Sequence, residues 1–172
     1  MTDQNQTNYK LKKKHQNRKM NCIRRLCFST TTRITWADTQ PFVAPIKKGV
    51  VIKVYDGDTI TIASKLPYRN SPMYRFSVRL FGIDTAEMKT KDKDELEMAK
   101  LARDKLSEKI LNKTVILKDI KREKYGRLLA NVYCDKICLN EWMLEKKLAV
   151  SYDGGKKAIV DWKSFLVYNK NV

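Results

Sequence analysis

The sequence predicts a small, mainly β, α+β domain preceded by a disordered basic arm. Short alternating apolar segments separated by turn residues begin at Gly49, and a single long helical pattern interrupts them. Residues 1–48 show neither the alternation of a strand nor the apolar spacing of a helix. The chain has 172 residues, of which 42% are apolar, so it can bury one hydrophobic core and is not disordered throughout. We therefore expect an arm over 1–48 and a folded domain over 49–172.

The first predicted elements of the domain are three strands. A β-rich segment over 50–55 and an alternating segment over 59–62 flank the turn Asp56-Gly57-Asp58, which predicts a hairpin. After a loop with two prolines, residues 76–83 form another predicted strand, broken near Gly82. The three strands account for the first half of a sheet.

A helix and two further strands follow. Residues 92–111 predict a helix that ends at Asn112, since apolar residues recur at spacings of three and four; they are Ala99, Ala102, Leu106 and Ile110. The remaining predicted elements are, in order, a strand at 115–117, a charged loop at 121–126, and a strand at 128–134 that the turn Asp135-Lys136 directs toward 137–139. A short helix capped by Asn140 and ending at Lys147 follows, and a last helix over 157–168 packs Trp162 and Phe165 on the barrel. A helix between the third and fourth of five strands is the order found in the OB-fold barrel, so we predict that barrel with about three helices.

Charge indicates the class of partner. The chain has 36 Lys and Arg and 19 Asp and Glu, a formal charge of +17. Residues 1–49 contribute +9 and residues 50–172 contribute +8. This excess favours nucleic acid over an anionic membrane as the partner. No apolar run approaches the roughly 18 residues of a membrane-spanning helix.

The arm has a simple interpretation as a solvated basic tail that attracts phosphates without specificity. Its stretch from Lys10 to Arg33 is basic and contains no acidic residue, which leaves an organelle transit peptide as an alternative. No apolar stretch suits a secretory signal, so we expect an intracellular protein with reduced thiols. The cysteine pairs Cys22/Cys27 and Cys134/Cys138 lack the Cys-x-x-Cys spacing of zinc knuckles, and small buried hydrophobic residues are the better interpretation of the second pair.

Four polar patches stand at the ends of apolar strands. They are Asp56-Gly57-Asp58-Thr59, Arg79, Asp84-Thr85-Ala86-Glu87 and Lys124-Tyr125-Gly126-Arg127. Each patch taken alone is more often structural than functional. Together they supply oxygen ligands for a divalent cation, a spare carboxylate to activate water, and two arginines for a phosphate. This set of groups suits phosphodiester hydrolysis.

The same blocks resemble the signatures of staphylococcal-nuclease-like thermonucleases. The matching segments are 54–59, 78–87 and 123–130, in the family's order, with five residues from Arg79 to Asp84 and three from Asp84 to Glu87. The resemblance covers residues 48–168. It implies an OB-fold, calcium-dependent phosphodiesterase, acting on DNA and RNA with little sequence specificity and leaving 3′-phosphate ends.

The resemblance also implies roles for individual residues. Calcium would be bound by Asp58, Asp84 and the backbone carbonyl of Thr85, supported by Asp56. The reacting phosphate would be held by Arg79 and Arg127, and Glu87 would activate or position water. Substrate contacts would come from Lys124, Tyr125 and Tyr152, although a core tyrosine is an equal alternative for Tyr152. We expect DNA or RNA as partner, no membrane, and a monomer.

Three departures and two rival functions accompany this interpretation. Ala86 replaces the family's usual proline, the segment from Met88 to Asp94 is shorter than the family's mobile loop, and the chain ends soon after its last helix begins. One rival is a non-catalytic nucleic-acid-binding OB module, but such modules characteristically lose the carboxylates and arginines that are present here. The other is a membrane-surface protein, and the arm lacks the amphipathic face that it would need.

Overall fold

The computed structural model describes residues 33–123 and 126–171, which fall into two units. In the first unit, which ends at Gln40, a short 3-10 helix η2 spans Trp36–Asp38. Asp38 Oδ2 accepts hydrogen bonds from both the backbone nitrogen and the hydroxyl of Thr35, which caps this turn. The second unit, Pro41–Val172, contains the fold, and the predicted arm boundary at residue 48 stays a prediction. Ala44 and Ile46 already lie in the core of this unit.

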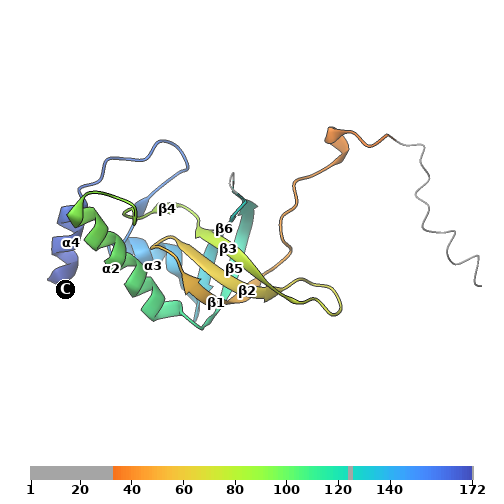
Figure 1. Cartoon of the computed structure of the whole chain (residues 1–172), viewed down its shortest axis with the longest axis horizontal. Coiled ribbons are helices and arrows are strands. Elements are labelled where there is room, and N and C mark those ends of the chain that lie inside the picture. The colour runs from red at the N-terminus through yellow and green to blue at the C-terminus, as the bar shows by residue number, and fades with distance from the viewer. Residues whose placement is uncertain (1–32, 124–125, 172) are drawn as a thin grey trace, which may run out of the picture. The chain divides into compact units, whose positions relative to one another are not determined.

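The second unit is a five-stranded mixed β-barrel with three α-helices, as predicted (Figure 1). Antiparallel pairing gives the strand order β3-β2-β1-β5-β6, and parallel pairing of β3 with β6 closes the barrel. The strands are β1 (Lys48–Val54), β2 (Thr59–Lys65), β3 (Met73–Leu80), β5 (Thr114–Arg122) and β6 (Leu128–Cys134). Short strands β4 (Ile83–Asp84) and β8 (Val150–Ser151) pair with each other, and β7 (Ile137–Cys138) pairs with β6.

The register of the barrel follows from alternating side chains. Along β6 every second residue is buried, which places Ala130 and Val132 inside and turns the residues between them outward. The predicted hairpin of β1 and β2 is confirmed, with Val54 opposite Ile60 across the turn. Arg79 stands opposite Thr59 in the β2–β3 ladder, so the end of β3 lies next to this turn.

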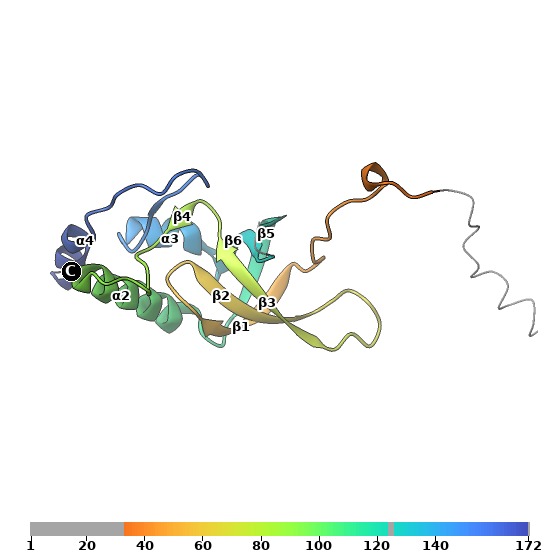
Figure 2. The ribbon, with the colours of Figure 1, turned by 45° about the horizontal axis from the view of Figure 1, so that its top comes forward.

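Three helices cover one end of the barrel (Figure 2). They are α2 (Lys93–Ile110), α3 (Leu139–Glu145) and α4 (Trp162–Lys170). The predicted buried face of α2 is confirmed, and Met98 joins it. Asp92 caps α2, since its Oδ1 accepts from the backbone nitrogens of Asp94 at 2.8 Å and Glu95 at 3.1 Å. Helix α4 lies beside α2 in both views (Figures 1 and 2), and Trp162 and Phe165 pack against the core as expected.

Asn140 does not cap α3, which is a correction to the prediction. The helix begins after Cys138, and Asn140 lies inside it, buried. Its amide nitrogen donates to the carbonyls of Phe81 at 2.7 Å and Ala130 at 3.3 Å, while its Oδ1 accepts from the backbone nitrogen of Val132 at 2.9 Å. A buried amide whose nitrogen and oxygen both have partners thus ties α3 to the barrel.

Two predicted boundaries are also wrong. Strand β5 continues to Arg122, because Lys121 and Arg122 pair with Leu129 and Leu128, so the charged loop is shorter than predicted. Residues 157–161 are not helical, and α4 begins at Trp162 after the capping residue Asp161. Cys134 is buried and Cys138 is half-buried, in line with the structural interpretation, while Cys22 and Cys27 lie outside the described residues.

Candidate active site

The β1–β2 turn presents two of the predicted carboxylates. Gly57 is required at its centre, because a Cβ there would lie 2.8 Å from Thr85 Cγ2 and 3.0 Å from Ala102 Cβ. The backbone carbonyl of Asp58 accepts from Leu80 N at 2.8 Å, which fixes the turn against β3. Asp58 is therefore only 3% exposed, and its backbone nitrogen donates to Asp56 Oδ1 at 3.4 Å.

Arg79 joins the two predicted metal-binding carboxylates. Its Nη1 lies 2.5 Å from Asp58 Oδ2, and its Nη2 lies 2.8 Å from Asp84 Oδ1. The same Nη2 donates to the Ile83 carbonyl at 3.3 Å. All three side chains are largely buried, with 12% of Arg79 exposed. One planar guanidinium therefore fixes the position of both carboxylates.

Burial disfavours the charged form of Asp58. Burial and, to a smaller extent, the nearby Asp56 charge raise the pKa of its carboxyl to about 7, in opposition to the positive charge of Arg79. The hydroxyl of Thr59 donates to Asp58 Oδ1 at 2.8 Å and favours the charged form. Additional positive charge at this position would therefore stabilise the ionised carboxylate.

Lys157 is the cation at this site that the sequence did not single out. Its Nζ lies 3.1 Å from Asp84 Oδ2 and forms a second ion pair with Glu87 Oε1. Partial burial lowers the pKa of the Lys157 ammonium, but the hydrogen bonds to Glu87 and Asp84 outweigh this and raise it. Asp84 and Glu87 are thus held within reach of one ammonium group.

The segment that carries Lys157 is fixed beside β4. Strand β8 pairs Ser151 with Ile83, and Tyr152 N donates to the Gly82 carbonyl at 2.9 Å. The Tyr152 hydroxyl donates to the Gly155 carbonyl at 2.8 Å, which closes the turn before Lys157. No signal within 152–157 alone points to this placement, because it depends on the pairing of β8 with a strand far away in sequence.

Arg127 connects to Asp58 through the hydroxyl of Thr59. Its Nε and Nη2 bind the two carboxylate oxygens of Glu123 at 2.5 and 2.8 Å. Its Nη1 donates to Thr59 Oγ1 at 3.4 Å, and Thr59 in turn donates to Asp58. Hydrogen bonding to Glu123 raises the pKa of Arg127, so its guanidinium is charged at neutral pH. Sequence reasoning assigned no role to Glu123.

The other predicted site residues are placed unevenly. The Tyr152 ring centroid lies 5.9 Å from Arg79 Cζ, so this tyrosine faces the site. Thr85 is buried beside Asp84, whereas the Glu87 side chain is 58% exposed. Asp56 is half-buried. Lys124 and Tyr125 lie outside the described residues.

The oxygen donors suit a hard cation in kind, although they are few. Over the described ranges 33–123 and 126–171, no group of three His, Cys, Asp or Glu side chains is spaced to hold a metal ion. Asp58 and Asp84 nonetheless share one guanidinium, and burial works against the charge of Asp58. Calcium takes six to eight oxygens and accepts carbonyls and water beside carboxylates. The carboxylates of Asp58 and Asp84 therefore fit as part of such a ligand set.

Comparison with known proteins identifies the family. Residues 77–170, more than half of the chain, match the family described as staphylococcal nuclease homologue. An uncharacterized protein of Bacillus anthracis is 35% identical over 99 residues, which cover 56% of this chain and 43% of that protein. The chain thus spans less than half the length of this relative. In the part of the chain that is described, no helix is both long and apolar enough to span a membrane. The chain belongs to the staphylococcal nuclease homologue family.

Proposed function

We propose that the chain is a calcium-dependent nuclease that hydrolyses DNA, and also RNA, with little sequence specificity. The observation that supports this most is the position of Arg79 between Asp58 and Asp84 at the end of β3. A guanidinium group held by two carboxylates is oriented before substrate arrives. Preorganised positive charge of this kind stabilises charge that develops on phosphate oxygens.

Two arginines would bind the reacting phosphate. Arg79 and Arg127 each form an ion pair with a carboxylate. Arg79 contacts Asp58 directly, and Arg127 connects to it through Thr59. Guanidinium groups can form paired hydrogen bonds to phosphate oxygens, which lysine cannot reproduce. Their carboxylate partners fix the side chains and so reduce the entropy lost when a phosphate binds.

Glu87 would position or deprotonate the attacking water. Its side chain is 58% exposed, so water reaches it, and it shares the Lys157 ammonium with Asp84. A solvent-accessible carboxylate beside a phosphate site is suited to this role. Attack that expels the 5′ oxygen would leave a 3′-phosphate.

Asp58, Asp84 and the Thr85 carbonyl would hold calcium, with Asp56 hydrogen-bonded behind Asp58. A bound calcium ion would supply positive charge to the phosphate oxygens. Tyr152 would contact the substrate from the side of Arg79. Lys124 and Tyr125 would contact a neighbouring phosphate.

Cleavage of single-stranded DNA by the full chain tests the proposal. With calcium we expect fragments that carry 3′-phosphate ends, and with a chelator we expect none. Asp84→Asn should lose the calcium-dependent cleavage while still folding. Fragments with 3′-hydroxyl ends, or equal cleavage with chelator, would contradict the proposed chemistry.

The rival function is a binding module that does not cut. One observation favours it: Lys157 already supplies an internal positive charge to both Asp84 and Glu87. Retention of DNA on the chain with calcium, without any fragment, would establish that function instead.

A further inference from the structure

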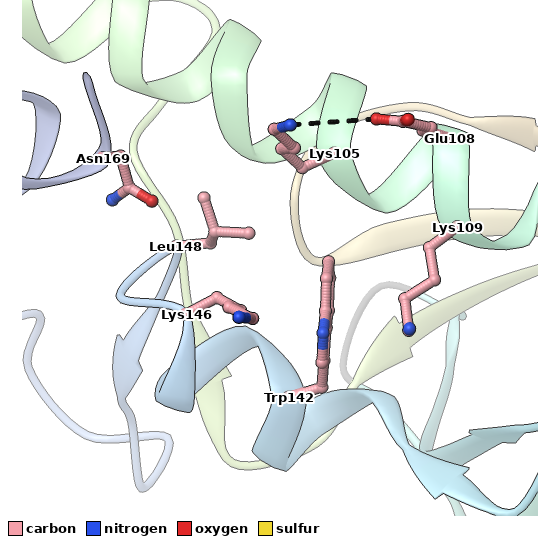
Figure 3. Close-up of a pocket in the computed structure, with 7 residues that line it drawn as sticks. All are labelled: Lys105, Glu108, Lys109, Trp142, Lys146, Leu148 and Asn169. Carbon is pink, nitrogen blue, oxygen red and sulfur yellow. Dashed lines mark ion pairs between the residues drawn. The ribbon is translucent and has the colours of Figure 1, made fainter. Parts of the chain in front are cut away.

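A cavity of about 480 Å³ lies among the three helices. Residues from α2, α3 and α4 line it, and Figure 3 shows them as sticks. None of its lining residues belongs to the candidate active site. The proposed cleavage chemistry therefore gives this cavity no role.

Trp142 of α3 forms one apolar wall of the cavity. In Figure 3 its indole stands between Lys109 on one side and Lys146 and Leu148 on the other. The Lys109 Nζ lies 4.8 Å from the ring centroid, which is a cation–π contact on that face. The opposite face borders the cavity, with the buried Leu148 beyond it. A flat aromatic group suits such a space.

The charge around this indole is mainly positive and poorly neutralised. Three lysines line the cavity, namely Lys105, Lys109 and Lys146, against the single acid Glu108. Lys105 lies 3.9 Å from Glu108, at the outer limit of an ion pair and exposed to solvent, so this pair neutralises little. Within residues 33–123 and 126–171, Lys109 and Lys146 have no carboxylate partner. The cavity therefore favours an anion.

Asn169 of α4 adds a polar group at the rim. Its amide nitrogen donates to the carbonyls of Lys147 at 3.1 Å and Phe165 at 2.9 Å. These two bonds fix the amide, and Figure 3 shows its oxygen on the side toward Leu148. An oriented acceptor of this kind can receive an N–H from the edge of a base.

We propose that this cavity binds one nucleotide of a single-stranded nucleic acid. The base would lie against Trp142, and its phosphates would contact Lys105 and Lys146. Proteins that bind single-stranded nucleic acid without sequence preference usually stack its bases on aromatic side chains and contact its phosphates with basic side chains. An acidic peptide would satisfy the lysines but would leave the indole face without a stacked partner. The proposal goes beyond cleavage, because it needs no calcium and none of the residues of the candidate active site.

Binding in a chelator tests this site separately from any cleavage. The probe is a short oligothymidylate, titrated against the full chain at low salt. Lys146→Glu should weaken binding about tenfold, the expected effect of losing one favourable contact and adding a repulsive charge. Lys118→Glu is the matched control, since Lys118 is also exposed and lies 4.3 Å over an aromatic ring, that of Tyr133 in β6. It changes the net charge equally and should have a much smaller effect.

A second measurement tests whether a base stacks on Trp142. Trp36→Phe removes an exposed indole of the first unit. In that background, oligothymidylate should quench the fluorescence of Trp142, and the further change Trp142→Phe should abolish most of the quenching. An abasic oligonucleotide of the same length should quench little. Quenching by thymidine monophosphate as well would support the site and show that a free nucleotide suffices.

Three results would overturn the proposal. They are an equal loss of affinity in Lys146→Glu and Lys118→Glu, equal binding of the abasic strand, and an acidic peptide that competes as well as the oligonucleotide. Because all of these assays use a chelator, failure of the proposed nuclease activity does not affect them.

Discussion

Cations are held in opposite ways in two regions of the folded unit. At the end of β3 and β4, the cations Arg79, Arg127 and Lys157 are each paired with a carboxylate. Between the helices, Lys109 lies over an indole face and Lys105 is only weakly paired. Carboxylate pairing fixes a charge in one orientation, as chemistry on a phosphate requires. Lysines that have no carboxylate partner remain available to attract a single strand of nucleic acid.

The largest expected effect comes from Arg79→Ala at the first region. We expect cleavage to fall roughly 100- to 1,000-fold, since one preorganised donor is lost. The free energy of unfolding should also fall by about 3–5 kcal/mol, because two buried carboxylates lose their shared partner. Cleavage rates and denaturant titrations measure the two effects.

The control for this change is Arg103→Ala, since the partly exposed Arg103 pairs with the exposed Asp104 on α2. It should change stability by less than about 1 kcal/mol. Equal destabilisation by both substitutions would mean that burial of the Arg79 pair contributes nothing special.

Glu123→Gln tests whether the two-point contact between Glu123 and Arg127 contributes to cleavage. Without the Glu123 charge, Arg127 should become mobile, and cleavage should fall about tenfold. Stability should change little, because Glu123 and Arg127 are both partly exposed. Unchanged cleavage in steady-state assays would show that Arg127 needs no partner.

Lys157→Ala should strengthen calcium binding by about fivefold, because it removes a cation that already neutralises Asp84. Calcium titration by calorimetry, without nucleic acid, measures this directly. The matched control is Lys156→Ala, an exposed neighbour of the same charge. Weaker calcium binding in Lys157→Ala alone would indicate that the ammonium instead orders the site.

Stability in a chelator should fall as pH rises from about 4 to about 7. Burial raises the pKa of Asp58 from 3.8 in the unfolded chain to about 7 in the folded chain, so the folded state keeps a proton that the unfolded state releases. Asp58→Asn should flatten this part of the profile in denaturant titrations. An equally steep decline in that variant would assign the pH dependence to other groups.

Local sequence patterns predicted the part of the site that lies on neighbouring strands. The Asp-Gly turn after β1 follows from turn chemistry, which acts within a few residues, whereas the spacing from Arg79 to Asp84 was read from the resemblance to the family. Lys157 meets Glu87 from 70 positions away. That contact depends on β8 pairing with β4, which periodicity does not encode. The helical interpretation of 157–161 hid it further.

The difference between local patterns and contacts that are distant in sequence also explains what was missed elsewhere. Asn140 has the residue type of a helix cap, yet its amide satisfies backbone groups of the barrel, so tertiary hydrogen bonding outweighed a local preference. The helical cavity combines side chains from α2, α3 and α4, and no single segment contains its pattern. The barrel itself was predictable from the order of its elements, with a helix between the third and fourth of five strands.

The most direct test of the account measures cleavage and binding of single-stranded DNA in one experiment. Wild type and Asp58→Ala are compared with calcium and with a chelator, under single-turnover conditions. We predict that wild type cleaves only with calcium, and that Asp58→Ala binds DNA but does not cleave it. Calcium-independent binding without hydrolysis by wild type would contradict the account and identify the chain as a binding module.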